Sequence, residues 1–107
     1  MKNFILIYRS GITFKKHFTD AQQGDISKQW HDWVASLGTS YIDSSSIIKG
    51  GWLVSENDIA EVEVNENMIN GYILVQAISK DEVVDMCKRC PLFQVGKTFE
   101  IRELPNK

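Results

Sequence analysis

The stretch 71–91 constrains the fold of this chain more than any other part of the sequence. Residues 72–78 form a run of strand length that is apolar except for Gln76, which is typical of a strand covered on both faces. Ser79 then supplies a helix N-cap, and Glu82 follows at the spacing of a capping box. This spacing predicts a helix over residues 80–89, which ends before a proline because proline cannot continue a helix. The stretch therefore predicts a buried strand followed directly by a helix.

The N-terminal third repeats this order of strand and helix. Residues 4–9 form a second continuous apolar run of strand length. Thr19 and Gln22 have capping-box spacing and predict a helix that begins near residue 20. Gly24 weakens this helix by about 1 kcal/mol relative to alanine, and Asp25 offers a second start. The apolar residues of the helix share one face at a spacing of 3.6, and a glycine supplies the stop: Ile26, Trp30, Trp33, Val34, Leu37 and Gly38.

The remaining apolar segments predict shorter or one-sided strands over residues 41–48, 52–54, 59–64 and 97–104. The order β-α-β(β)-β-α-β predicts an α+β fold, a ferredoxin-like βαββαβ sandwich with an antiparallel sheet and two helices on one face. In this topology the first and third main strands are central, and they correspond to the two runs that are apolar on both faces. We expect a single domain over residues 1–107, with no repeat or linker.

The helices can cover only one face of such a sheet, so the apolar residues on the other face need a partner. On the third main strand, Ile73, Val75 and Ala77 are expected to face the helices. The outward patch then comprises Tyr72, Leu74 and Gln76, with Phe4, Leu6 and Tyr8, or their alternates, added from the first strand. We therefore predict a homodimer packed sheet to sheet, with Gln76, Glu100 and Arg102 lining whatever cavity remains.

Composition excludes several classes of protein. The 107 residues are 43% hydrophobic and 24% charged, as in a soluble globular domain. A formal net charge of −2 argues against a nucleic-acid-binding domain, which is normally basic. No apolar run approaches the roughly 18 residues of a membrane helix, and the apolar start is too short for a signal peptide. With only two cysteines, we expect a reduced, cytoplasmic protein that binds neither membrane nor nucleic acid.

Cys87 and Cys90 form the one motif that suggests redox or metal chemistry. A reactive pair normally lies at a helix N-terminus, where the dipole stabilises the thiolate, whereas this pair lies at a predicted C-terminus. Zinc needs about four ligands, and His17 and His31 lack the spacing of a zinc finger. We interpret the cysteines as core residues and predict no metal and no cofactor, since phosphate-loop and dinucleotide motifs are also missing.

Five polar side chains remain as candidates for a functional site. His31 lies at the rim of the first helix's apolar face, either as a boundary residue or as an acid/base group in a cleft. Glu100 and Arg102 share one face of a strand, so they can pair together, bind a substrate carboxylate or cross a dimer interface. The catalytic candidates are His31 and Tyr8, and the ligand-binding candidates are Tyr8, Gln76, Glu100 and Arg102. The three tryptophans are expected in the core and at the interface, because no basic stripe accompanies them.

Several short motifs, in their order and spacing, resemble the YCII-related proteins, including the subgroup named for a DGPF motif. The matches cover nearly the whole chain: Phe4 to Tyr8, Thr19 leading to Trp30-x-x-Trp33 and Leu37-Gly38, Gly71 to Val75, Asp81 to Val84, Arg89-Cys90-Pro91 and Phe99 to Arg102. The resemblance implies a dimeric α/β barrel of ferredoxin-like protomers. Residue by residue, it carries over Tyr8, Glu100 and Arg102.

The chain departs from this family at the residues that would carry catalysis. Residues 59–62 stand where the Asp-Gly-Pro-Phe tetrapeptide is expected. Ile26 stands in the register of a histidine early in the first helix, and Cys90 replaces an aspartate before the proline. Both halves of the family's proposed His-Asp pair are missing, so the hydrolytic or dehalogenating activity inferred for parts of the family does not carry over.

These observations leave three hypotheses for the function. The first is a YCII-like homodimer that binds a small molecule on the open sheet face, without an obvious catalytic centre. The second is a cofactor-independent lyase, isomerase or hydrolase of the dimeric-barrel type that acts on a small anionic substrate, with His31 or Tyr8 as proton carrier beside Arg102. The third is a protein-interaction partner, for example of a transcription regulator, as some relatives are fused or adjacent to sigma factors.

Overall fold

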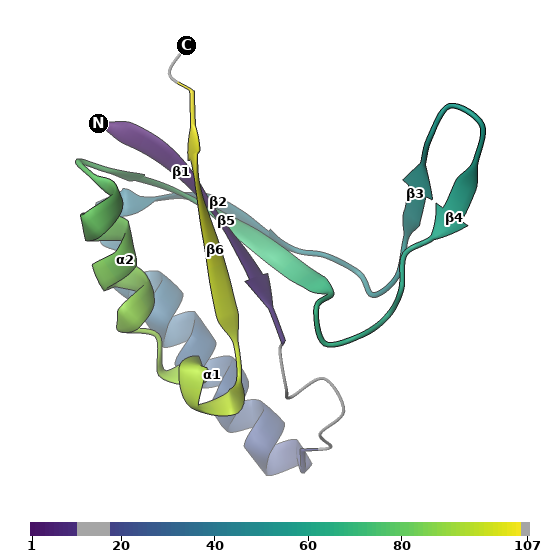
Figure 1. The fold of residues 1–107 in the computed structure, drawn as a ribbon. Coiled ribbons are helices and arrows are strands. Elements are labelled where there is room, and N and C mark those ends of the chain that lie inside the picture. The colour runs from purple at the N-terminus through teal and green to yellow at the C-terminus, as the bar shows by residue number, and fades with distance from the viewer. Residues whose placement is uncertain (11–17, 106–107) are drawn as a thin grey trace.

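The computed structural model describes residues 1–10 and 18–105, and its elements follow the predicted order (Figure 1). The elements of the main body are β1 (Lys2–Arg9), α1 (Asp20–Ser36), β2 (Tyr41–Ser46), β5 (Ile69–Ala77), α2 (Lys80–Lys88) and β6 (Thr98–Leu104). Two short 3-10 helices, η2 (Gly38–Ser40) and η3 (Pro91–Val95), follow α1 and α2. A hairpin of β3 (Trp52–Val54) and β4 (Ile59–Glu61) stands between β2 and β5. Within the described residues, no helix is long and apolar enough to cross a membrane.

The main sheet has four strands in the order β2-β5-β1-β6, and every neighbouring pair is antiparallel. The two runs that are apolar on both faces, β1 and β5, are central, as predicted. Helices α1 and α2 lie on one face of this sheet (Figure 1). The predicted α+β, ferredoxin-like fold is therefore confirmed.

The core lies between the sheet and the two helices. Successive strand residues point to opposite faces, and on β5 the residues Ile73, Val75 and Ala77 are buried beneath the helices, as predicted. On β1 the buried set is Phe4, Leu6 and Tyr8, so the alternates Ile5 and Ile7 lie on the open face, opposite Leu74 and Tyr72 of β5. Of the two sets that the sequence left open, the alternates therefore form the outward patch, and the Tyr8 side chain points toward the helices.

Helix α1 begins at the predicted capping box. The Thr19 hydroxyl accepts a hydrogen bond from Gln22 N at 3.2 Å, and the Gln22 carboxamide oxygen accepts one from Thr19 N at 2.9 Å. The helix then runs through Gly24 without a break, so the second start at Asp25 is wrong. Capping before the glycine and packing after it outweigh the cost of about 1 kcal/mol that an exposed glycine imposes. Gly38, with φ of +57°, follows the helix at the predicted stop.

The β3–β4 hairpin is separate from the main sheet. Its strands pair with each other only, in a two-stranded sheet of their own. Figure 1 shows the hairpin standing off from the body, on the side of the sheet that faces away from α1 and α2. The extended segments predicted over residues 41–48 and 59–64 are shorter in the structure, because each gives way to a connection between the sheet and this hairpin.

Candidate functional site

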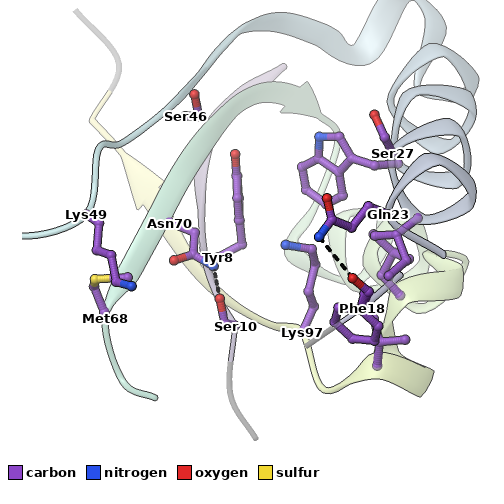
Figure 2. Close-up of a pocket in the computed structure, with 14 residues that line it drawn as sticks. Tyr8, Ser10, Phe18, Gln23, Ser27, Ser46, Lys49, Met68, Asn70 and Lys97 are labelled. Atoms are coloured by element: carbon purple, nitrogen blue, oxygen red, sulfur yellow. Dashed lines mark hydrogen bonds between the residues drawn. The ribbon is translucent and has the colours of Figure 1, made fainter. Parts of the chain in front are cut away.

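A cavity of about 580 Å³ lies where α1 diverges from the sheet, on the helix side of the molecule (Figure 2). Its wall comes from the end of β1, the first half of α1, the segments on either side of the hairpin, and the region from η3 to β6. Its lining is mainly apolar with a polar rim: Tyr8, Ser10, Phe18, Gln23, Ile26, Ser27, Trp30, Ser46, Lys49, Met68, Asn70, Leu92, Val95 and Lys97. An apolar concave surface with a few polar groups is typical of a small-molecule site.

Lys97 packs over two neighbouring aromatic rings at this cavity. Its Nζ is 5.2 Å from the ring centroid of Tyr8 and 5.1 Å from that of Trp30. The two rings are tilted by 56° with centroids 4.7 Å apart, so the ammonium contacts both π faces, a favourable arrangement for a cation. Gly96, with φ of +86°, ends η3 in a left-handed conformation, and this reversal directs the chain through Lys97 into β6.

Burial shapes the electrostatics of the cavity. Loss of solvent lowers the pKa of Lys97, an effect that the Cys90 thiol offsets in part. Among the described residues, no carboxylate lies within ion-pair distance of the Lys97 ammonium. Burial also raises the pKa of the Tyr8 hydroxyl, which therefore stays protonated and serves as a hydrogen-bond donor. The cavity thus presents a cation and a phenol but no acidic partner from the described chain.

The rim of the cavity carries hydroxyl and amide groups that fix one another. Asn70 Nδ2 donates to Ser10 Oγ, and Gln23 Nε2 donates to the Phe18 carbonyl at 3.2 Å (Figure 2). These bonds join the start of β5 to the end of β1, and the first turns of α1 to the residue before its cap. The rim is therefore held by groups from separate elements.

Glu100 and Arg102 lie on the opposite, open face of the sheet. There they pair with each other, which is one of the alternatives that the sequence predicted. Glu100 accepts from Arg102 Nε at 2.7 Å and from Arg9 Nη1 at 3.0 Å. Gln76, at the other end of this face, donates to the Thr39 carbonyl at 3.0 Å. Tyr8 faces the helices, so within one chain the structure does not bring it together with Glu100 and Arg102.

His31 is exposed rather than half-buried. It lies on α1 beside a shallow groove that is also lined by Trp30, Tyr41 and Ser44. The groove is on the helix side of the sheet, whereas Arg102 is on the open face. The predicted combination of His31 or Tyr8 with Arg102 is therefore not assembled within one chain.

Cys87 and Cys90 are buried and form no disulfide, in agreement with their interpretation as core residues. Burial raises the pKa of the Cys87 thiol to about 12, so this group is a poor nucleophile at neutral pH. In the part of the chain that the structure describes, no three His, Cys, Asp or Glu side chains gather as metal ligands. His17 lies outside the described residues.

The ion pairs of Glu100 predict a specific dependence of stability on pH. Hydrogen bonds from Arg102 and Arg9 hold the pKa of Glu100 below its ordinary value of 4.5. The stabilisation is therefore fully present above that value and is lost as pH falls through the lowered pKa. We expect Glu100→Gln to lose less stability than the wild type between about pH 6 and about pH 3 in urea unfolding. An equal loss in both proteins would contradict this assignment.

Sequence reasoning missed Lys97 and did not anticipate a cavity on the helix side of the sheet. Lys97 stands at the start of the predicted strand 97–104, where it reads as an ordinary exposed lysine. The only signal near it was Gly96, a residue able to turn the chain sharply before a strand. Trp30 was predicted as core, and it does pack there, stacked at 7° on Phe99 with centroids 6.2 Å apart. Its other side borders the cavity.

No family model matches this sequence, and no curated protein matches it. Among solved structures, the chain is similar to 5-chloro-2-hydroxyhydroquinone dehydrochlorinase from Burkholderia phenoliruptrix, in a complex with 2,5-dihydroxybenzoquinone. The similarity has a TM-score of 0.54 and covers 97% of this chain and 95% of that one, at 16% sequence identity. At this identity the comparison establishes the shared ferredoxin-like α+β fold.

Proposed function

We propose that this protein binds a small, flat organic anion in the cavity between α1 and the sheet. The observation that carries the proposal is the half-buried Lys97 ammonium, which packs over the rings of Tyr8 and Trp30 without a carboxylate partner among the described residues. A cation removed from water without a counter-charge is costly, and a ligand oxyanion would relieve that cost. The ring faces and apolar walls would then hold the body of the ligand.

The shape and chemistry of the cavity favour an oxygen-bearing ring compound. Ile26, Leu92 and Val95 supply apolar walls, and the protonated Tyr8 hydroxyl supplies a donor for a second oxygen atom. The dehydrochlorinase with the same fold is complexed with 2,5-dihydroxybenzoquinone, a flat ring whose acidic hydroxyls ionise readily. By this likeness we extend the proposal to membership of the YCII-related family and to a homodimer packed through the open sheet faces.

A cofactor-independent enzyme is the second candidate, because Tyr8 and Lys97 lie together at the cavity. The raised pKa of Tyr8 suits it to donate a hydrogen bond or a proton rather than to act as a base. Ile26, which stands where some YCII-related proteins have a histidine, lines the same cavity. An apolar side chain at that place favours binding over hydrolysis.

Replacing Lys97 by methionine tests the proposal. We expect Lys97→Met to raise the dissociation constant for 2,5-dihydroxybenzoquinone by about tenfold or more, because a charge-assisted hydrogen bond is lost while the side chain keeps its length and apolar stem. Titration followed by tryptophan fluorescence measures the constant, since Trp30 borders the cavity. Lys88→Met, at an exposed lysine on α2, is the matched control and should bind as the wild type does. Equal affinity of Lys97→Met and the wild type would refute the anchor.

A further inference from the structure

The β3–β4 hairpin exposes large apolar side chains on both of its faces. Trp52, Val54 and Ile59 are 74%, 69% and 68% exposed and share one face, because Trp52 pairs with Glu61 and Val54 pairs with Ile59. Leu53, 70% exposed, lies on the other face. An isolated two-stranded hairpin is marginally stable in water at best. Strands of three residues with this much apolar exposure therefore indicate a surface that is covered in the functional state.

The base of the hairpin is fixed toward the open face of the main sheet. The Arg9 side chain lies on that face, where its Nη1 pairs with Glu100 at 3.0 Å. Its Nε donates to the carbonyl of Asn67 at 3.1 Å, on the segment that leads from the hairpin back to β5. Gly51 O accepts from Val62 N at 2.8 Å and closes the pairing at the hairpin's foot. These bonds agree with Figure 1, in which the hairpin stands on the side away from the helices.

The exposed surface of the chain is large enough for a second copy to cover part of it. The chain has an accessible surface of 7643 Å² at a mass of 12.2 kDa, whereas a compact monomer of that mass exposes about 6,100 Å². Its radius of gyration is 15.3 Å, against about 13 Å for a compact domain of this length. The excess, about 1,500 Å² per chain, is more than the roughly 800 Å² that each partner contributes to a standard interface.

We infer that the hairpin is a dimerisation arm that packs its Trp52, Val54 and Ile59 face against a second copy of this chain. The inference rests on the proposed homodimer of open sheet faces, and it adds an element that no ferredoxin-like sheet requires. The open face presents Ile5, Ile7, Tyr72 and Leu74, all half-buried in the single chain. Because the arm and this face lie on the same side, one second copy covers both in an isologous contact, and the symmetry closes at two chains.

Two isoleucines allow a matched test of the arm. Ile59 in the arm is 68% exposed, and Ile78, after β5 on the main body, is 72% exposed. We expect the wild type to sediment as a dimer at about 20 µM and Ile59→Asp to raise its dissociation constant by at least about a hundredfold, since the new carboxylate would be buried against the partner. Ile78→Asp carries the same change outside the arm, at the end of the open sheet face, and is expected to weaken the dimer far less than Ile59→Asp does.

The outcomes separate the arm from the rest of the proposal. An Ile59→Asp protein that dimerises as tightly as the wild type overturns the arm and leaves the sheet-to-sheet dimer standing. A wild type that is monomeric at about 20 µM overturns both the arm and the sheet-to-sheet dimer. Binding of 2,5-dihydroxybenzoquinone, titrated in the same samples, tests the proposed ligand site separately. Trp52→Ser removes apolar contact without adding charge, and we expect it to weaken the dimer by about tenfold. Far-UV circular dichroism checks that each variant keeps its fold.

Discussion

Replacing Gly71 with alanine is expected to lower the free energy of unfolding by about 3 kcal/mol, the upper end of the usual cost of overpacking. Gly71 is buried on β5, directly opposite Tyr8 of β1. The Tyr8 ring and hydroxyl occupy the space that a β-carbon would take, and the Ser45 carbonyl oxygen would lie 2.6 Å from it. The backbone of β2 cannot move away without breaking its pairing with β5, so the steric clash cannot be relieved without losing hydrogen bonds.

Thermal unfolding of Gly71→Ala measures this effect, with an expected fall in Tm of about 10–20 °C. Gly24→Ala is the matched control, because nothing lies within 4 Å of an added β-carbon there. Gly24 is an exposed residue inside α1, and alanine should raise the free energy of unfolding by about 0.5–1 kcal/mol. A Gly71→Ala protein as stable as the wild type would show that Tyr8 does not pack over the glycine.

Trp33→Ala is expected to be the most destabilising single truncation, by about 4 kcal/mol. Trp33 is 4% exposed and joins the two helices, because its Nε1 donates to the Met86 carbonyl of α2 at 3.0 Å. Its ring lies 5.3 Å, between centroids, from both Trp30 and Phe99. The truncation would therefore leave a void in the aromatic cluster and separate α1 from α2.

Trp33→Phe divides the packing contribution from that of the hydrogen bond. Phenylalanine keeps much of the ring, and the Met86 carbonyl retains the amide of Arg89 as a donor at 3.3 Å. We expect this variant to lose about 1–2 kcal/mol, as measured by urea unfolding. Equal losses for Trp33→Phe and Trp33→Ala would mean that the hydrogen bond, and not the packing, accounts for the effect.

Most of the fold could be predicted because its signals are local and repeated. Continuous apolar runs at β1 and β5 predicted the two central strands, and the Thr19 and Ser79 caps predicted where the helices begin. The small size of the hairpin strands and the single helix through Gly24 could not be predicted, because both depend on tertiary packing rather than on local preference.

The site was harder to predict, because the sequence does not show which face of the sheet each strand residue points to. On a strand that is apolar on both faces, the pattern does not say which alternate residues meet the helices, so the sequence leaves open whether Tyr8 or its alternates lie on the open face. In the structure Tyr8 faces the helices, away from Glu100 and Arg102. Lys97 was missed because its neighbours Tyr8 and Trp30 are 89 and 67 positions away in the sequence, and only the folded chain brings them together.

The segments that carry the hairpin also border the cavity: Ser46 and Lys49 lie before the hairpin, and Met68 and Asn70 lie after it. The two chain segments that connect the hairpin to the main sheet therefore also form part of the cavity wall. If seating the arm in a dimer changes the affinity of the cavity for its ligand, then saturating ligand changes the dimerisation constant by the same factor. Occupancy and assembly would then form one thermodynamic cycle, and a binding curve would be meaningful only at a stated concentration of chains.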